Sequence, residues 1–467
     1  MFDSMATRTF ARPGHSAQPA LVGFVLAGAG LLALLIGLSL GQNTLDLWGA
    51  VGIPVIIVSL MAPIVISRER RKPVDLGRLM VLGLVARFIA TYVRYLMEAQ
   101  YYRAGDALTY GSVGASTASQ VWAGDLPASR LVPSGTATSF IRSLTGLVQL
   151  ITVQSTAGAF VVYSFFSFLG IWAFINAARR ALPDLHIRRY AMLVLFMPSM
   201  LFWASAIGKD AWMVMWLGLF AAGAARMLTR ARGGVALVTL SALMGGVCRP
   251  HVMLLAIGAL LMTVVFVGSR NARSAGRGGA SRIVFTLLLV VGLTVAFSSL
   301  TVIFPKAEPL SDPGSVTGLV TQAANKTALG GSQIETTSPN AVWNYPFAML
   351  SGLYRPLLIE ARNPPTLIAA LEGTALLVLT VLWRRNIVTG IRSFRRTPYL
   401  LFAALYASMF FVVWSSISNL GILARQRVQG LPFILLLLAV ETAQERAARQ
   451  EVEATVAPVT SSPILEV

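Results

Sequence analysis

The segment "ALVGFVLAGAGLLALLIGLSLG" at residues 20–41 decides the class of fold, because it contains neither a charged residue nor a proline. A helix needs about 20 apolar residues to cross the hydrocarbon core of a bilayer, and this segment meets that length. The apolar region of a cleaved signal peptide is shorter, about 7–15 residues, and a small-residue cleavage site follows it. No clear A-x-A site follows residue 41, so we expect a retained membrane-spanning helix.

The same apolar pattern recurs along the whole chain of 467 residues. Hydrophobic residues make up 55% of it, charged residues only 12%, and the mean hydropathy is +0.69. This composition is more apolar than that of soluble domains and predicts an all-α, polytopic membrane protein. We expect about twelve spans, near residues 20–41, 47–67, 76–97, 157–178, 189–207, 211–228, 234–248, 252–268, 283–304, 366–383, 398–417 and 431–442.

The orientation of these spans is predicted by the arginine-rich segments, because Lys and Arg accumulate in cytoplasmic loops. Such segments are "RERRK" at 68–72, "ARR" at 178–180, "RMLTRAR" at 226–232, "SRNARSAGRGGASR" at 269–282 and "WRRNIVTGIRSFRR" at 383–396. All fall on one side of the predicted topology. We therefore expect these segments and both termini in the cytoplasm, and the long loops 98–140 and 305–365 on the outer side.

No internal repeat is visible, so residues 20–442 are expected to form one membrane domain between the tails 1–19 and 443–467. The second tail is rich in Glu, Ala and Arg and then in Pro, Ser and Val, which predicts a short helix followed by disorder. The segment "SFIRSLTGLVQLITV" at 139–153 is expected to be an interfacial or re-entrant helix.

The formal net charge of +19 does not indicate a nucleic-acid partner, because the basic residues stand in short clusters between apolar segments. The single cysteine, Cys248, cannot form a disulfide within the chain. No Cys/His cluster predicts zinc, no cofactor is expected, and a divalent metal has no support from the sequence.

Charged residues also gather in four turns that this topology places outside, against the usual bias of Lys and Arg toward the cytoplasm. They are Lys209 and Asp210 in "MPSMLFWASAIGKDAW", Arg249 and His251 in "CRPHVMLL", Arg355, Glu360 and Arg362 in "LYRPLLIEARNP", and Arg425 and Arg427 in "SNLGILARQRVQGLP". Guanidinium groups bind phosphate oxygens bidentately and lysine adds a point charge, so the set predicts a phosphate or pyrophosphate site. The competing interpretation of each arginine alone is that it only reaches the lipid headgroups.

One acid, Asp106 in "GDALTYGSVG", follows the third expected span on the outer side. A carboxylate beside a bound phosphosugar can take a proton from an acceptor hydroxyl, and Tyr110 can stack on a sugar. The alternative is that Asp106 only caps a helix that begins there.

These stretches resemble GT-C-type glycosyltransferases, integral membrane enzymes that use polyprenyl-phosphate-linked sugars on the outer face, and bacterial membrane proteins of surface-polysaccharide assembly. The resemblance covers most of residues 76–440 and implies a GT-C-like fold in a bacterial plasma membrane. It implies Asp106 as the catalytic acid, a polyprenyl-linked sugar as donor, and a glycan or glycolipid as acceptor. Many such enzymes have two adjacent acids in this loop, whereas here Asp106 stands alone until Asp125.

Two alternatives remain open. One is an O-antigen-polymerase-like enzyme or ligase that acts on an undecaprenyl-diphosphate-linked glycan, in which the arginines and His251 dominate. The other is a transporter or flippase of a lipid-linked sugar, which would carry ionisable groups at mid-membrane and often inverted repeats. The main mid-span charges, Arg87 and Glu372, are expected to form a structural pair instead.

Overall fold

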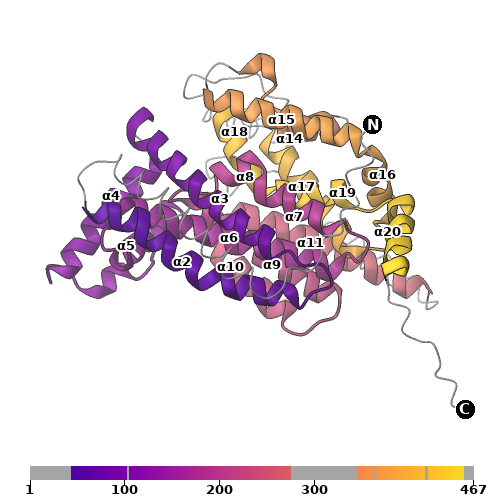
Figure 1. Ribbon diagram of the computed structural model, residues 1–467, viewed down its shortest axis with the longest axis horizontal. Coiled ribbons are helices and arrows are strands. Elements are labelled where there is room, and N and C mark those ends of the chain that lie inside the picture. The colour runs from indigo at the N-terminus through magenta and orange to yellow at the C-terminus, as the bar shows by residue number, and fades with distance from the viewer. Residues whose placement is uncertain (1–43, 103–104, 275–343, 362–363, 416–418, 457–467) are drawn as a thin grey trace, which may run out of the picture. The chain divides into compact units, whose positions relative to one another are not determined.

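The computed structural model describes residues 44–102, 105–274, 344–361, 364–415 and 419–456 (Figure 1). Within these ranges the regular structure is helical, apart from one isolated bridge between Leu185 and Val440. The chain divides into two compact units. Unit 1 holds residues 1–134, 142–165 and 205–207, and unit 2 holds residues 135–141, 166–204 and 208–467.

Five helices in the described part of the chain are long and apolar enough to cross a membrane. They are Trp48–Arg70 within α2 (Thr44–Arg70), Gly77–Tyr102, which joins α3 (Gly77–Leu96) to a π-helix (Met97–Tyr102), α6 (Thr156–Ala181), α9 (Lys209–Leu228), and Pro250–Gly268 within α11 (Pro250–Ser274). Two bent helix pairs raise the number to seven if each is one span. They join α15 (Pro364–Leu382) to α16 (Arg384–Ser393), and α18 (Leu420–Gln426) with η5 (Arg427–Gln429) to α19 (Leu431–Ala439).

The helical, apolar character predicted from the sequence is thus confirmed, whereas the twelve spans are not. The expected spans 20–41 and 283–304 lie outside the described residues, as do the tail 1–19, the end of the second tail (457–467), Arg362 and most of the loop 305–365. Two further expected spans are short apolar helices, α10 (Gly234–Gly246) and α17 (Pro398–Trp414).

The span expected over 189–207 is wrong as a single helix. The structure has α7 (Ile187–Phe196) and a separate short helix, α8 (Pro198–Phe202). Proline has no backbone N–H and disfavours a helical conformation in the residue before it. Met197 accordingly has an extended backbone, with ψ of 127°.

The expected outer loop 98–140 is largely helical. It contains the end of the π-helix, then α4 (Asp106–Trp122), a 3-10 turn (Ala128–Leu131) and the beginning of α5 (Thr138–Ile151). The helix expected over 139–153 is therefore present as α5. Helix α4 was not predicted as a full helix from the sequence.

Unit 1 is held together at the beginning of α6 by an acid from α2. Asp46 Oδ1 accepts hydrogen bonds from the backbone N–H of Thr156 at 2.9 Å and from Ser155 Oγ at 3.2 Å. Its other oxygen accepts from Tyr95 of α3 at 3.2 Å, and the Tyr95 ring packs edge-on against Phe160 of α6. A carboxylate at a helix N-terminus satisfies N–H groups that have no partner within the helix. Asp46 therefore joins three helices.

In unit 2, α6 and α9 cross at a pair of glycines. A Cβ atom added to Gly170 would overlap the backbone of Val214 and Met215, and one added to Gly218 would overlap the backbone of Gly170. Small residues allow two membrane helices to approach this closely. The crossing fixes the first turn of α9, which carries two of the predicted site residues.

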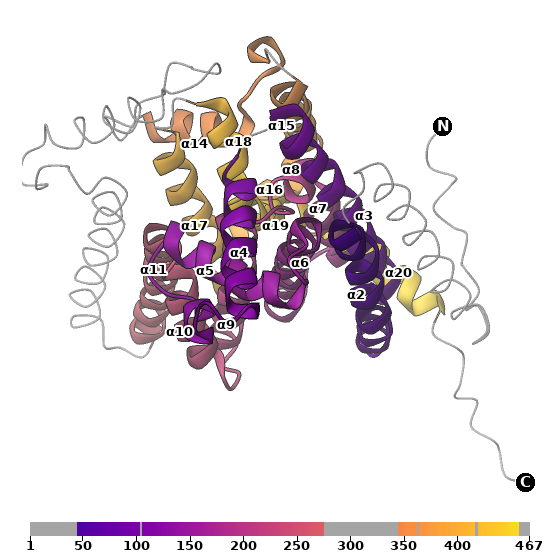
Figure 2. The ribbon, with the colours of Figure 1, turned by 90° about the vertical axis from the view of Figure 1, so that its left-hand side faces the viewer.

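The apolar core of unit 2 centres on aromatic rings. Phe433 of α19 contacts Tyr406 and Phe402 of α17 and Phe174 of α6, with ring centroids 4.4, 5.8 and 5.1 Å apart. Helix α17 also lies against α11 and α14 (Tyr345–Tyr354), as Figure 2 shows. The core therefore ties together helices that are distant in sequence.

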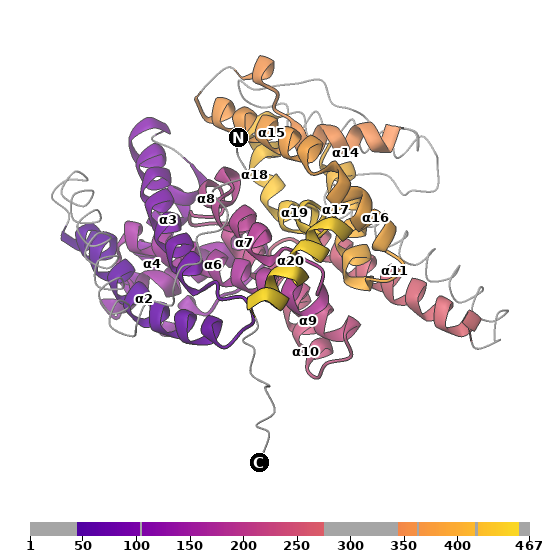
Figure 3. The same cartoon turned by 45° about the vertical axis from the view of Figure 1, so that its right-hand side comes forward.

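The last described helix, α20 (Ala443–Val456), begins near α16 (Figure 3). Glu445 accepts hydrogen bonds from Arg189 of α7 and from Asn386 of α16, both at 2.7 Å. Burial alone would raise the pKa of Glu445, but the Arg189 hydrogen bond and the backbone N–H of Thr442 outweigh it and lower the pKa to about 2. This carboxylate fastens the C-terminal helix to the membrane helices.

Candidate anion-binding site

Three helix ends of unit 2 bring cationic residues together. Helix α9 begins with Lys209 and Asp210, directly after Gly208, whose φ of 152° favours glycine. Arg249 immediately precedes α11, which begins at Pro250, and Arg425 lies in the last turn of α18. From the sequence, these four residues were predicted to lie in three separate outer turns, with Lys209 and Asp210 in the same turn.

Asp210 is the centre of this group. Its Oδ1 lies 2.8 Å from Arg249 Nη2, and its Oδ2 accepts a hydrogen bond from Arg425 Nε. Arg249 also donates to Gln426 Oε1 at 2.6 Å. The Asp210 and Arg249 side chains are only 4% and 8% exposed, whereas that of Arg425 is 27% exposed. The carboxylate is shared between two guanidinium groups, so its role is to fix them rather than to accept a proton.

Lys209 lies beside this group and is half-buried. Its Nζ donates to Thr138 Oγ1 of α5 at 2.9 Å. The same end of α5 is held by a backbone hydrogen bond from Ala137 to Val247 and by contact of the Phe140 ring with Trp212 of α9. The beginning of α5 thus belongs to the site.

The cation cluster, defined as Lys209, Asp210, Arg249 and Arg425, holds three positive charges against one carboxylate, a net charge of +2. Its partly exposed members are Lys209 and Arg425. Such a group can bind the oxygens of a phosphate. Thr138 and Gln426 accept hydrogen bonds from Lys209 and Arg249 of the cluster, and no signal in the sequence indicated either.

Arg427 lies apart from the cation cluster. Its guanidinium is fully buried, 3.2 Å from Glu372 Oε1, and it donates to the carbonyl of Leu353 at 3.1 Å and to Ser199 Oγ at 3.2 Å. Ser199 N also donates to Glu372. The sequence analysis expected Arg87 as the partner of Glu372, whereas within unit 2 the structure provides Arg427. These contacts join η5, α8, α14 and α15. They are typical of an ion pair that stabilises the fold.

Arg355 and Glu360 form a second closed pair between α14 and the 3-10 turn η4 (Leu358–Glu360). Arg355 Nε donates to both carboxylate oxygens of Glu360, at 2.8 and 3.2 Å, and Leu357 N donates to the same carboxylate at 2.8 Å. Burial raises the pKa of Glu360, but these hydrogen bonds lower it below its ordinary value. The two residues contact each other, and the structure does not bring them into the cation cluster.

His251, on the first turn of α11, stacks on Trp414 of α17 with ring centroids 5.6 Å apart. This contact packs α11 against α17. His251 is two residues from Arg249, and its imidazole ring contacts an aromatic side chain.

Asp106 and Tyr110 belong to unit 1. Asp106 is the first residue of α4 and is exposed, Gly105 is the N-cap, and Tyr110 is buried one turn later. Near the beginning of α4 lies a buried ion pair between Arg94 and Glu98, which the sequence analysis did not single out although its i, i+4 spacing was visible.

Among the described residues, no three His, Cys, Asp or Glu side chains gather as a metal site would require. Comparison with known proteins finds no matching family model, no matching curated protein and no matching solved structure.

Proposed function

We propose that the protein is a membrane glycosyltransferase that takes a sugar from a polyprenyl-phosphate carrier at the extracytoplasmic face. The observation that carries this proposal is the cation cluster, in which the guanidinium groups of Arg249 and Arg425 meet at Asp210, next to Lys209 at the beginning of α9. A net charge of +2 in an apolar chain suits an anion that is itself attached to a lipid.

In this mechanism Lys209 and Arg425 contact the phosphate of the donor, and Arg249 supports it from the buried side. The acceptor oxygen forms a bond to the anomeric carbon of the sugar while the bond between that carbon and the phosphate oxygen breaks, and the leaving phosphate gains negative charge. Fixed cations stabilise that charge most in the transition state, which accelerates transfer. Asp210 holds Arg249 and Arg425 in place, so that they need no rearrangement during the reaction.

Asp106 is proposed to take the proton from the acceptor hydroxyl of a glycan or glycolipid. Its exposure at the beginning of α4 leaves it accessible to an acceptor. The cation cluster has its own carboxylate, but Asp210 is already shared by two arginines. A separate base is therefore needed for general-base assistance.

The alternative enzyme is a polymerase or ligase that releases undecaprenyl diphosphate. The cation cluster itself favours this alternative, because a diphosphate leaving group carries more negative charge than a monophosphate. The reaction then depends less on a base that activates the acceptor. The two enzymes differ in whether activity requires Asp106.

A sugar-transfer assay in proteoliposomes tests the proposal with a polyprenyl-phosphate-linked sugar as donor. We expect Arg425→Gln to lower transfer by about 10-fold or more, since a charge-assisted hydrogen bond contributes about 1.5–3 kcal/mol. The matched control is Arg130→Gln, which removes an exposed arginine from the same predicted side and leaves transfer unchanged. Equal activity of wild type and Arg425→Gln would contradict the proposal.

A further inference from the structure

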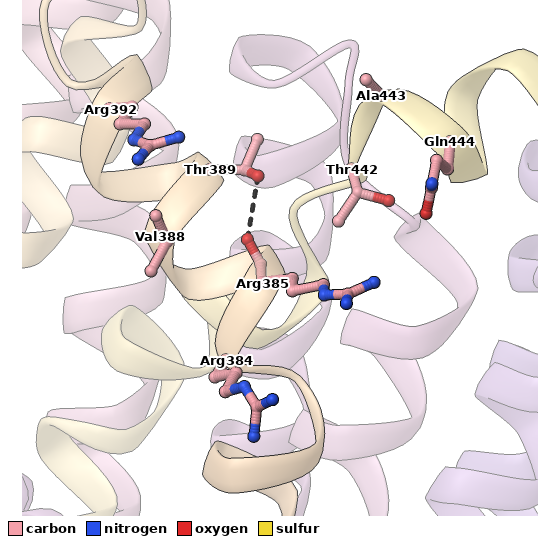
Figure 4. Close-up of a pocket in the computed structure, with 8 residues that line it drawn as sticks. All are labelled: Arg384, Arg385, Val388, Thr389, Arg392, Thr442, Ala443 and Gln444. Atoms are coloured by element: carbon pink, nitrogen blue, oxygen red, sulfur yellow. Dashed lines mark hydrogen bonds between the residues drawn. The ribbon is translucent and has the colours of Figure 1, made fainter.

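A second basic site lies between α16 and the beginning of α20 (Figure 4). It is a cavity of about 460 Å³. Arg384, Arg385 and Arg392 line it from α16, and Thr442 and Gln444 line it from the other side. The cavity shares no residue with the cation cluster, so it does not depend on the proposed transfer reaction.

The three arginines of this cavity are exposed, and their guanidinium groups have neither a hydrogen bond nor an ion pair with the described residues. The acids near the cavity already form ion pairs with other arginines. Glu445 pairs with Arg189 at 2.7 Å, and Glu441 pairs with Arg449 at 3.0 Å. The cavity therefore keeps three positive charges that the described protein does not neutralise.

The helices that precede and carry these arginines, α15 and α16, also have exposed apolar side chains. Helix α15 exposes Leu371, Val378 and Leu382 along its length, and α16 exposes Val388 and Ile391. The chain turns by 71° between the two helices. An amphipathic basic helix set at such an angle to an apolar one is typical of a helix that lies in the membrane interface.

We infer that this cavity binds the phosphate group of an anionic phospholipid, with the acyl chains along the exposed face of α15. Guanidinium groups bind phosphate oxygens bidentately, and basic pockets beside membrane helices attract anionic headgroups. The segment 383–396 belongs to the side that the arginine distribution predicts to be cytoplasmic. The ligand is thus a lipid of the cytoplasmic leaflet.

Microscale thermophoresis on the full-length protein in detergent tests this inference, with three probes. They are a short-chain phosphatidylglycerol, a phosphatidylcholine with the same acyl chains, and inorganic phosphate. We expect phosphatidylglycerol to bind at least about 10-fold more tightly than either of the others. The triple variant Arg384→Gln/Arg385→Gln/Arg392→Gln should weaken phosphatidylglycerol binding by at least about 10-fold. It should keep the wild-type unfolding temperature, because these guanidinium groups form no hydrogen bond or ion pair with the described residues.

The matched control is Arg226→Gln/Arg230→Gln/Arg232→Gln, which removes three exposed arginines from the end of α9 and the turn after it, on the same predicted side. We expect it to leave phosphatidylglycerol binding unchanged. Equal weakening in both triple variants would overturn the inference, because diffuse charge would then explain the binding. Equal affinity for inorganic phosphate would overturn the lipid assignment in favour of a soluble phosphate. If the wild type bound phosphatidylcholine as tightly as phosphatidylglycerol, that result would overturn the inference of an anionic-lipid site. This comparison needs no variant.

Discussion

Asp210 lies between Arg249 and Arg425, and each of its carboxylate oxygens faces a different guanidinium group. Asp210→Asn would remove the negative charge and leave two arginines close together. Loss of one partner from a buried ion pair costs about 3–5 kcal/mol. We therefore expect a lower unfolding temperature for Asp210→Asn, measured on purified protein in detergent.

The coupling within this group is tested by the double variant Asp210→Asn/Arg249→Gln. Removal of one arginine relieves the repulsion, so the double variant should be less destabilised than the sum of the two single variants. Strictly additive losses would show that the three side chains do not act as a unit.

The orientation of the chain is the second prediction, and it rests on the inner arginine clusters. A single cysteine in place of exposed Ser116 on α4 should react with an impermeant maleimide in intact cells, in a Cys248→Ala background. A cysteine in place of exposed Thr229, after α9, should react only after permeabilisation. The reverse pattern would place the cation cluster on the cytoplasmic side and remove the outer-face mechanism.

The third prediction concerns Asp106. Asp106→Asn keeps the shape of the side chain but removes its basic oxygens, so transfer should fall by about 10²–10⁴-fold while binding of polyprenyl phosphate is retained. Because Gly105 is the N-cap, the change removes from Asp106 a charge–dipole contribution to the helix of about 0.3–1 kcal/mol. Asp125→Asn, an exposed acid of the same predicted loop, is the control and should remain active. A fully active Asp106→Asn would favour the polymerase or ligase.

The sequence predicted the long helices of the described residues well, because an apolar segment of about 20 residues with few charges admits few other structures. It also placed Asp210, Arg249 and Arg425 at helix ends on the same predicted side, within a larger group, and these three contact one another in the structure. The sequence did not show that Arg427 and Arg425 have different surroundings. Residues two positions apart on a helix point in different directions, and the buried partner Glu372 is 55 positions away in sequence.

Two features of the fold were harder to predict for physical reasons. The sequence did not predict the helix break before Pro198, because the residues on both sides are apolar enough to continue a span. Helix α4 was hidden because "DALTYGSVGASTASQVW" consists mainly of small and polar residues without a strong apolar face. The role of Thr138 as a partner of Lys209 depends on long-range packing, which no local pattern contains.

The fourth prediction is a pH dependence of stability from Glu445. Its pKa is lowered from an ordinary value of 4.5 to about 2, so its stabilising effect is complete above pH 4.5 and is lost as the pH falls toward 2. Glu445→Gln should lower the unfolding temperature at pH 7 and flatten its decline between pH 4.5 and 2. Glu451→Gln, on the exposed side of α20, provides the comparison. An unchanged acid profile in Glu445→Gln would contradict the assigned role.

Recognition of the donor phosphate by the cation cluster is the central claim, and a binding measurement tests it most directly. Wild-type protein and Arg425→Gln are titrated with polyprenyl phosphate and with the corresponding polyprenol, which has the same chain but no phosphate. We expect wild type to bind the phosphate at least about 10-fold more tightly than the alcohol, and Arg425→Gln to lose most of this preference. Equal affinity of the wild type for both lipids, or an undiminished preference in Arg425→Gln, would contradict the claim.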